Sequence, residues 1–243
     1  MASITARDRL IVALDLPSVA EARSFVDRMG PTVTFYKIGL ELFMAGGLEL
    51  ARALVGEGKQ VFLDMKLLDI ANTVKRATRN AAATGVTFLT VHAHDSKTLR
   101  AAAAGKAGTG LRILGVTVLT NLDSADVREQ GQAGSIEELV ARRAKLVHDA
   151  GCDGVVASGL EAARVREVVG PGIAIVTPGI RLAGEPTGDQ ARAVTPQIAI
   201  ASGADYIVVG RPINAAADPQ QAAETFVQAI EEALAMRSLG PPG

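Results

Sequence analysis

Charged residues of opposite sign occur at the ends of three short apolar segments. Asp15 ends the first segment and Lys37 lies in the second, while the third carries Asp64 and Lys66 and is followed by Asp69. In a β-strand, residues two apart point to the same face, so a strand here would place Asp64 and Lys66 side by side. We therefore predict that alternating positive and negative charges surround one concave space.

A lysine held between carboxylates stays protonated, because nearby negative charge favours the ammonium form. Such a lysine is a poor Schiff-base nucleophile, but it can stabilise a carbanion or donate a proton. The carboxylates would repel a carboxylate on a substrate, at about 4 kcal/mol for one contact at ~4 Å and an effective dielectric of ~20. Binding energy from a remote part of the substrate can offset that repulsion.

The alternative is that these charges form an ion-pair network with a purely structural role at the end of the fold. Buried ion pairs, however, often fail to offset the free energy of their desolvation. We favour a functional site.

A candidate binding site for such a remote group lies near the C-terminus. An apolar run leads into Gly210, Arg211 and Pro212, and a proline is well placed in the first turn of a helix. Backbone N–H groups at a helix start and an arginine fork suit a phosphate, although a plain turn would have the same residues. The loop over residues 178–190 is rich in glycine, so we expect either a mobile lid with Arg181 reaching the phosphate or an ordinary surface loop.

Two histidines form a weaker candidate site. His92 and His94 are two apart, with Asp95 beside them, and such residues can in principle hold a metal. Strand alternation and the shortage of other histidines argue against it, so we predict no metal and interpret His92 as a polar residue facing the site. We interpret His148, Cys152 and Asp153 as structural.

Short β-branched runs recur about every 28 residues and alternate with segments of helical periodicity. The predicted strands begin near Leu10, Thr34, Gln60, Phe88, Arg112, Gly154, Ile173 and Tyr206. Eight such units are typical of a (β/α)8 (TIM) barrel, whose sites lie at the carboxyl ends of the strands and whose phosphates bind after the last two strands. An open doubly wound sheet is the alternative, but it usually has a glycine-rich turn after its first strand, and none is present here.

The helical segments have recognisable boundaries. Ser18 precedes one of them, and Ser135 with Glu138 three residues later forms a potential capping box. The clearest predicted helices cover Val19–Met29, Leu48–Val55, Val74–Ala83, Ile136–Ala150 and Ala222–Met236. Since no linker or low-complexity segment divides the chain, we predict a single domain over residues 1–243 with a short frayed C-terminal tail.

Composition limits the classes of partner. The chain has 25 Lys and Arg against 26 Asp and Glu and only 3% aromatic residues, which argues against a nucleic-acid or membrane-surface patch. Cys152 is the only cysteine, so neither an internal disulfide nor a cysteine-based metal cluster can form. Neither a signal peptide nor an apolar run long enough to span a membrane is evident. We expect a soluble, cytoplasmic protein.

The segment Asp64-Met-Lys-Leu-Leu-Asp-Ile-Ala-Asn-Thr73 resembles the Asp-x-Lys-x-x-Asp-Ile-x-Asn-Thr signature of the orotidine 5′-phosphate decarboxylase family. The resemblance runs from Ile11 to Ile213, about four-fifths of the chain, and includes the landmarks Tyr36–Gly39, Val118–Thr120 and Thr177–Arg181. It implies a barrel homodimer that converts orotidine 5′-monophosphate into uridine 5′-monophosphate and CO₂ without a cofactor or metal, in pyrimidine biosynthesis.

The resemblance also implies roles for particular residues. Lys37, Asp64, Lys66 and Asp69 look like a catalytic tetrad in which Asp69 comes from the partner subunit and Lys66 protonates the C6 carbanion. The implied substrate-binding residues are Asp15, Lys37, Ile70, Thr73, Thr120, Asn121, Pro178, Arg181, Gln190, Gly210 and Arg211.

Two departures from the family pattern are visible. The family often has serine where this chain has Asn121, and glycines where this chain has His94-Asp95-Ser96. Two other functions remain as alternatives to the decarboxylase: a Mg²⁺-dependent sugar-phosphate decarboxylase or aldolase on the same barrel, and a non-catalytic sensor of a phosphorylated ligand.

Overall fold

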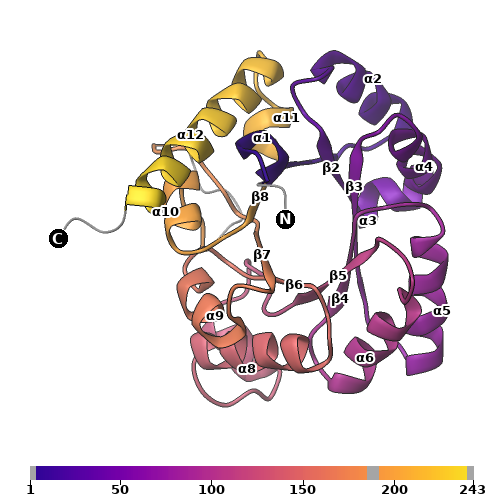
Figure 1. Cartoon of the computed structure of the whole chain (residues 1–243), viewed down its shortest axis with the longest axis vertical. Helices are drawn as coiled ribbons and strands as arrows, with labels where there is room; N and C mark the ends of the chain where they lie inside the picture. Colours follow the sequence, from indigo (N-terminus) through magenta and orange to yellow (C-terminus); the bar gives the residue numbers. More distant parts are fainter. Residues whose placement is uncertain (1–3, 185–191, 240–243) are drawn as a thin grey trace.

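Eight parallel strands close into a barrel in which each strand pairs with the next and the last returns to the first (Figure 1). The structure is a computed structural model that describes residues 4–184 and 192–239. Closure of the sheet confirms the predicted TIM barrel, and the open doubly wound alternative is wrong. Gln190 and the predicted frayed tail at residues 240–243 lie outside the described residues.

Each strand begins within one residue of its predicted start, because its β-branched run is buried on both faces and ends at a turn. The strands are β1 (Leu10–Ala13), β2 (Phe35–Gly39), β3 (Gln60–Leu67), β4 (Phe88–His92), β5 (Arg112–Val116), β6 (Gly154–Val156), β7 (Ala174–Thr177) and β8 (Tyr206–Val209).

The five predicted helices are present, with ends shifted by at most three residues. Ser18 caps one helix, and the capping box of Ser135 and Glu138 forms as predicted, with reciprocal bonds of 3.1 and 2.9 Å. The helical elements are α1 (Ala6–Arg9), α2 (Val19–Met29), α3 (Leu40–Leu42), η1 (Phe43–Gly47), α4 (Leu48–Gly56), α5 (Ala71–Ala82), α6 (Ser96–Gly105), α7 (Ser124–Glu129), α8 (Ile136–Asp149), α9 (Ala162–Val169), α10 (Pro196–Ala201), α11 (Arg211–Asn214) and α12 (Pro219–Leu239).

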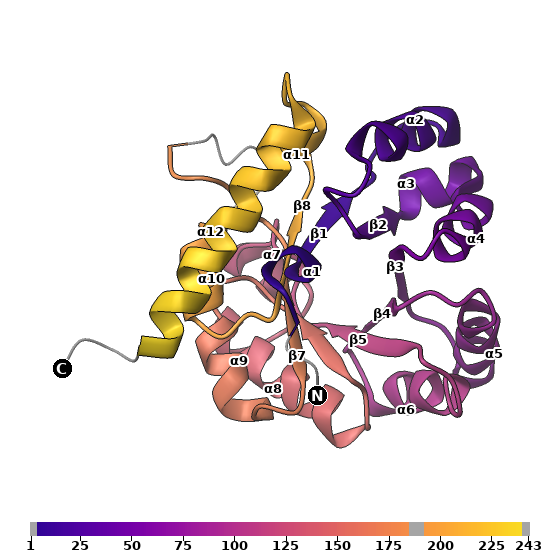
Figure 2. The ribbon, with the colours of Figure 1, turned by 45° about the horizontal axis from the view of Figure 1, so that its top comes forward.

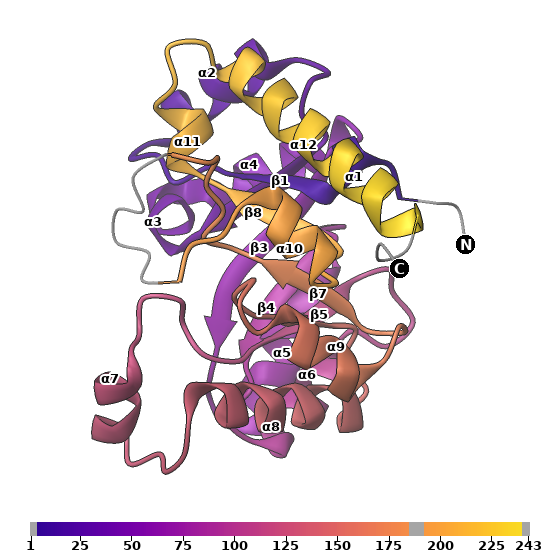
Figure 3. The same cartoon turned by 90° about the vertical axis from the view of Figure 1, so that its left-hand side faces the viewer.

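The helices form the outer layer, and α12 runs along the outside of the barrel beside α10 (Figure 2). The short elements α3, α7 and α11 follow the carboxyl ends of β2, β5 and β8, and they lie on one side of the molecule, opposite α1 (Figure 3). Within the described chain, no helix has the length and apolar character needed to cross a membrane.

Aromatic rings fill the barrel interior at the end opposite those short elements. The Phe88 ring centroid lies 5.1 Å from that of Phe35, 5.2 Å from that of Tyr206 and 5.8 Å from that of Phe62. All four rings come from the amino-terminal halves of their strands and are buried. They make an apolar floor, which leaves the carboxyl ends of the strands for polar side chains.

Replacing the central ring of this floor tests its contribution to stability. We expect Phe88→Ala to lower the free energy of unfolding by about 3–5 kcal/mol, because the ring is wholly buried and the cavity cannot collapse between closed strands. Urea denaturation measures the loss, with Leu160→Ala, whose side chain is largely exposed, as the control. A loss below about 1 kcal/mol would show that the floor is not close-packed.

Candidate active site

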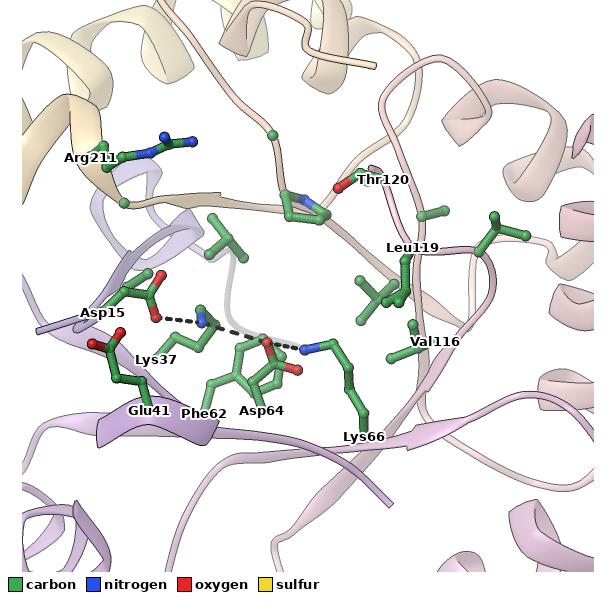
Figure 4. A pocket seen from close by; sticks show the side chains of 18 of the residues that line it. Asp15, Lys37, Glu41, Phe62, Asp64, Lys66, Val116, Leu119, Thr120 and Arg211 are labelled. Atoms are coloured by element: carbon green, nitrogen blue, oxygen red, sulfur yellow. Dashed lines mark hydrogen bonds and ion pairs between the residues drawn. The ribbon is translucent and has the colours of Figure 1, made fainter. Parts of the chain in front are cut away.

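A pocket of about 580 Å³ opens at the carboxyl ends of the strands, where barrel proteins place their functional residues (Figure 4). Its walls combine charged side chains with apolar residues from β3, β5, β6 and β8. The predicted site residues that line it are Asp15, Lys37, Asp64, Lys66, Thr120, Pro178, Arg181, Gly210 and Arg211.

Four charged side chains form a continuous row along one side of the pocket (Figure 4). Lys37 Nζ lies 3.1 Å from Asp15 Oδ1 and 3.5 Å from Asp64 Oδ2. Lys66 Nζ lies 2.8 Å from the same Asp64 Oδ2. The Asp64 carboxylate is therefore shared between two ammonium groups, as the alternation of charges in the sequence predicts.

Burial and charge act in opposite directions on Lys37 and Asp64. Their side chains are only 12% and 14% exposed. Burial by itself would lower the pKa of Lys37, but the charges of Asp64 and Asp15 outweigh it and raise that pKa. Burial likewise would raise the pKa of Asp64, but Lys37 and Lys66 outweigh it and lower that pKa. Both groups are therefore ionised at neutral pH.

The backbone of Lys66 departs from a regular strand. Its φ is +49°, the left-handed region, and no other non-glycine residue in the described parts of the chain has a positive φ. The β3–β4 register slips at the same place, since Leu63 pairs with Leu89 but Leu67 pairs with Val91. Asp64 and Lys66 do share the pocket, but a kinked strand places them there, and regular alternation does not. This conformation costs on the order of 1–2 kcal/mol.

Sequence reasoning missed the contacts that hold this irregular backbone. The Lys66 N–H donates to Thr90 Oγ1 at 2.9 Å, and that hydroxyl donates to Asp64 Oδ1 at 2.9 Å. Glu41, in α3 directly after β2, also lines the pocket, and no sequence motif marks it. The Thr90 contacts could be found only from the pairing of β4 with an irregular β3.

Arg211 and Gly210 line the part of the pocket that follows β8, and Arg181 lines it beyond β7. The helix that begins at Arg211, α11, has only four residues, so its dipole is small. A phosphate here would therefore depend chiefly on the guanidinium groups and on the half-buried backbone at Gly210.

Several predicted residues lie outside the pocket of a single chain. Asp69 follows β3 and accepts a hydrogen bond from its neighbouring backbone N–H at 2.6 Å, and the Ile70 side chain after it is 73% exposed. Thr73 and Asn121 are also exposed. In the part of the chain that the structure describes, none of these four residues lines the pocket.

His92 lies at the end of β4, with its ring centroid 5.0 Å from that of His94. Burial, together with the positive charge of Lys66, lowers the pKa of His92 to about 4, so the ring is neutral at physiological pH.

Within residues 4–184 and 192–239, no three His, Cys, Asp or Glu side chains group so that they could hold a metal ion. Cys152 is buried, and Asp153 pairs with Lys106 at 2.5 Å.

The closed barrel and its charged pocket define a (β/α)8-barrel protein with its site at the carboxyl ends of the strands. Residues 8–226 match the orotidine 5′-phosphate decarboxylase / HUMPS family, and the chain belongs to that family. It is 55% identical over 233 residues to an orotidine 5′-phosphate decarboxylase of Bradyrhizobium sp. (strain BTAi1), covering 96% of each chain. It is 53% identical to the protein of that name from Afipia carboxidovorans, covering 92% of this chain and 95% of that one.

A solved structure supports the same assignment. The crystal structure of orotidine 5′-phosphate decarboxylase from Lactobacillus acidophilus matches with a TM-score of 0.81 and 36% sequence identity, covering 91% of this chain and 98% of that chain.

The shared carboxylate makes a prediction about proton affinity. We expect Asp64→Asn to lower the pKa of Lys37, because burial then acts with only Asp15 left to oppose it. Nuclear magnetic resonance titration of lysine Nζ groups measures the change, with the exposed Lys145 as an internal reference. An unchanged Lys37 pKa in the variant would mean that Asp64 does not set the charge state of the row.

Proposed function

We propose that this protein decarboxylates orotidine 5′-monophosphate to uridine 5′-monophosphate and CO₂. The observation that carries the proposal is the row Lys37–Asp64–Lys66 at the mouth of the barrel, with one carboxylate between two ammonium groups. The names of the relatives support the same substrate. The product would feed pyrimidine nucleotide synthesis in the cytoplasm.

The pocket suggests how the substrate is oriented. Its phosphate binds near Arg211, Arg181 and Gly210, and Gln190 would join them from outside the described residues. The ribose hydroxyls then face Asp15 and Lys37, whose charges pair at 3.1 Å. The pyrimidine ring lies over Lys66, with Thr120 and Pro178 along its edge and Asn121 close by in sequence.

The reaction breaks the bond between C6 and the carboxylate and leaves the electron pair on C6. Lys66 Nζ carries the positive charge that stabilises this carbanion, and it transfers one proton to C6. Asp64 lies next to the departing carboxylate, and like charges at ~4 Å repel by about 4 kcal/mol at an effective dielectric of ~20. Loss of neutral CO₂ relieves the repulsion, while phosphate binding offsets it in the ground state. Lys66 then regains its proton from solvent.

We propose that a homodimer completes the site. Asp69, Ile70 and Thr73 follow β3 on the exposed edge of the mouth and need a second chain to reach a pocket. Large apolar side chains are exposed along the same edge, just beyond β2 and β3: Leu40 (54%), Met44 (83%), Leu68 (50%) and Ile70 (73%). Exposed apolar residues grouped in this way favour a protein–protein contact. In the dimer, the partner's Asp69 joins Lys37, Asp64 and Lys66 as the fourth member of the tetrad, next to the substrate carboxylate.

Turnover of the substrate tests the proposed reaction. We expect the loss of orotidine 5′-monophosphate absorbance to be catalytic, and Lys66→Ala to lower the rate at least ~1,000-fold, because one side chain supplies both the charge and the proton. Lys145→Ala, an exposed lysine, should have no effect. The activity should persist in excess chelator, since no step uses a metal.

The outcomes separate the candidate functions. Activity that disappears with chelator and returns with Mg²⁺ would favour the metal-dependent alternative. Binding of phosphorylated ligands with no turnover by the folded wild-type protein would favour the sensor.

Mixing two inactive variants tests the shared site. Lys66→Ala chains and Asp69→Ala chains together should regain up to about a quarter of the wild-type activity, because random exchange makes half of the dimers mixed and each mixed dimer has one intact site of two. Absence of recovery, with subunit exchange demonstrated by mass spectrometry, would place each site within one chain.

A further inference from the structure

Thr90, in the middle of β4, contacts both charged residues of the neighbouring strand while remaining outside the pocket lining. Its Oγ1 lies 2.9 Å from the Lys66 backbone N and 2.9 Å from Asp64 Oδ1. Thr90 is 0% exposed, so water does not compete for either bond. The β3–β4 register slips beside it, between the pairs Leu63–Leu89 and Leu67–Val91.

The direction of each bond follows from the atoms involved. A backbone N–H can only donate, so the Thr90 oxygen accepts from Lys66. A hydroxyl has a single proton, which is therefore available for Asp64 Oδ1. The second carboxylate oxygen, Oδ2, remains for the ammonium groups of Lys66 at 2.8 Å and Lys37 at 3.5 Å. One hydroxyl thus fixes the rotation of the carboxylate that both lysines share.

The same hydroxyl replaces a bond that the sheet cannot supply. In a regular parallel pair, a strand N–H donates to a carbonyl of the neighbouring strand. Where Lys66 takes its left-handed conformation, its N–H donates to the Thr90 side chain. The contacts close a ring that runs from the Lys66 backbone through Thr90 and Asp64 to the Lys66 ammonium group.

We propose that Thr90 is a positioning residue for the reaction, whose hydroxyl holds the Lys66 backbone in its left-handed conformation and orients Asp64, so that the Lys66 ammonium group is fixed at the reacting carbon. This inference rests on the decarboxylase function proposed above. Thr90 does not touch the substrate, and it acts only through these two residues.

Variants that keep or remove the hydroxyl test the role. Thr90→Val keeps the branched shape, and we expect it to lower kcat about 10- to 100-fold, because a shift near 1 Å of a reacting group has effects of this size. KM should change less than about 3-fold, since the phosphate contacts remain. Thr90→Ser keeps the hydroxyl and should retain at least about a third of kcat.

Thr78→Val is the matched control. Thr78 is also fully buried, on α5, and its hydroxyl has no hydrogen-bond partner among the described residues. The control should have wild-type kcat and KM. Circular dichroism and urea denaturation verify that each variant is folded. If Thr90→Val does not fold, Thr90→Ala takes its place in the comparison with Thr90→Ser.

The pH profile distinguishes positioning from packing. Asp64 faces Lys37 on β2, Lys66 on its own strand, and Thr90 and His92 on β4, with Asp15 beyond Lys37. Thr90→Val removes a hydrogen bond to the ionised carboxylate, so the acid limb of kcat/KM should move to higher pH. A loss of packing alone would leave that limb in place.

Each failure has its own signature. A folded wild-type protein that does not turn over orotidine 5′-monophosphate contradicts the proposed function. An active wild type in which the valine and serine variants are equally active, or equally impaired, contradicts the role of Thr90. A crystal structure of Thr90→Val tests the geometry without turnover: an unchanged left-handed Lys66 with its Asp64 contact intact would overturn the inference.

Discussion

The site depends on one carboxylate that two ammonium groups share. Asp64 keeps Lys37 charged in a pocket that would otherwise favour its neutral form, and the charges of Lys37 and Lys66 in turn keep Asp64 ionised. Buried ions of this kind are stable only as a set, because removing one partner leaves the others without compensation. The barrel satisfies this constraint by placing β1, β2 and β3 side by side, so that Asp15, two residues beyond β1, completes the row.

The sequence predicts the barrel well because its signals are local. Apolar β-branched runs, capping serines and terminal glycines each depend on a few neighbouring residues, and all eight strands begin where those signals indicate. The charged row is also predictable, since Lys37, Asp64 and Lys66 lie at strand ends that adjacent pairing brings together.

What the sequence could not predict depends on irregular or distant geometry. The slipped register of β3 and the left-handed Lys66 follow from contacts with β4 and have no motif of their own. Thr90 likewise has no recognisable sequence signal, because its proposed positioning role comes only from its hydrogen bonds to Asp64 and Lys66. Asp69 and Ile70 belong to the recognisable signature, yet one chain leaves them exposed, so the role proposed for them depends on the second chain of the proposed dimer.

The ring of Phe62 belongs both to the apolar floor and to the wall of the pocket. Any enlargement of the cavity toward the barrel centre therefore removes a ring that packs against Phe88. A change that lets the pocket accept a bulkier substrate in that direction would therefore also lower thermostability. The loops around the rim have more freedom, because insertions and exchanges there leave the interior untouched.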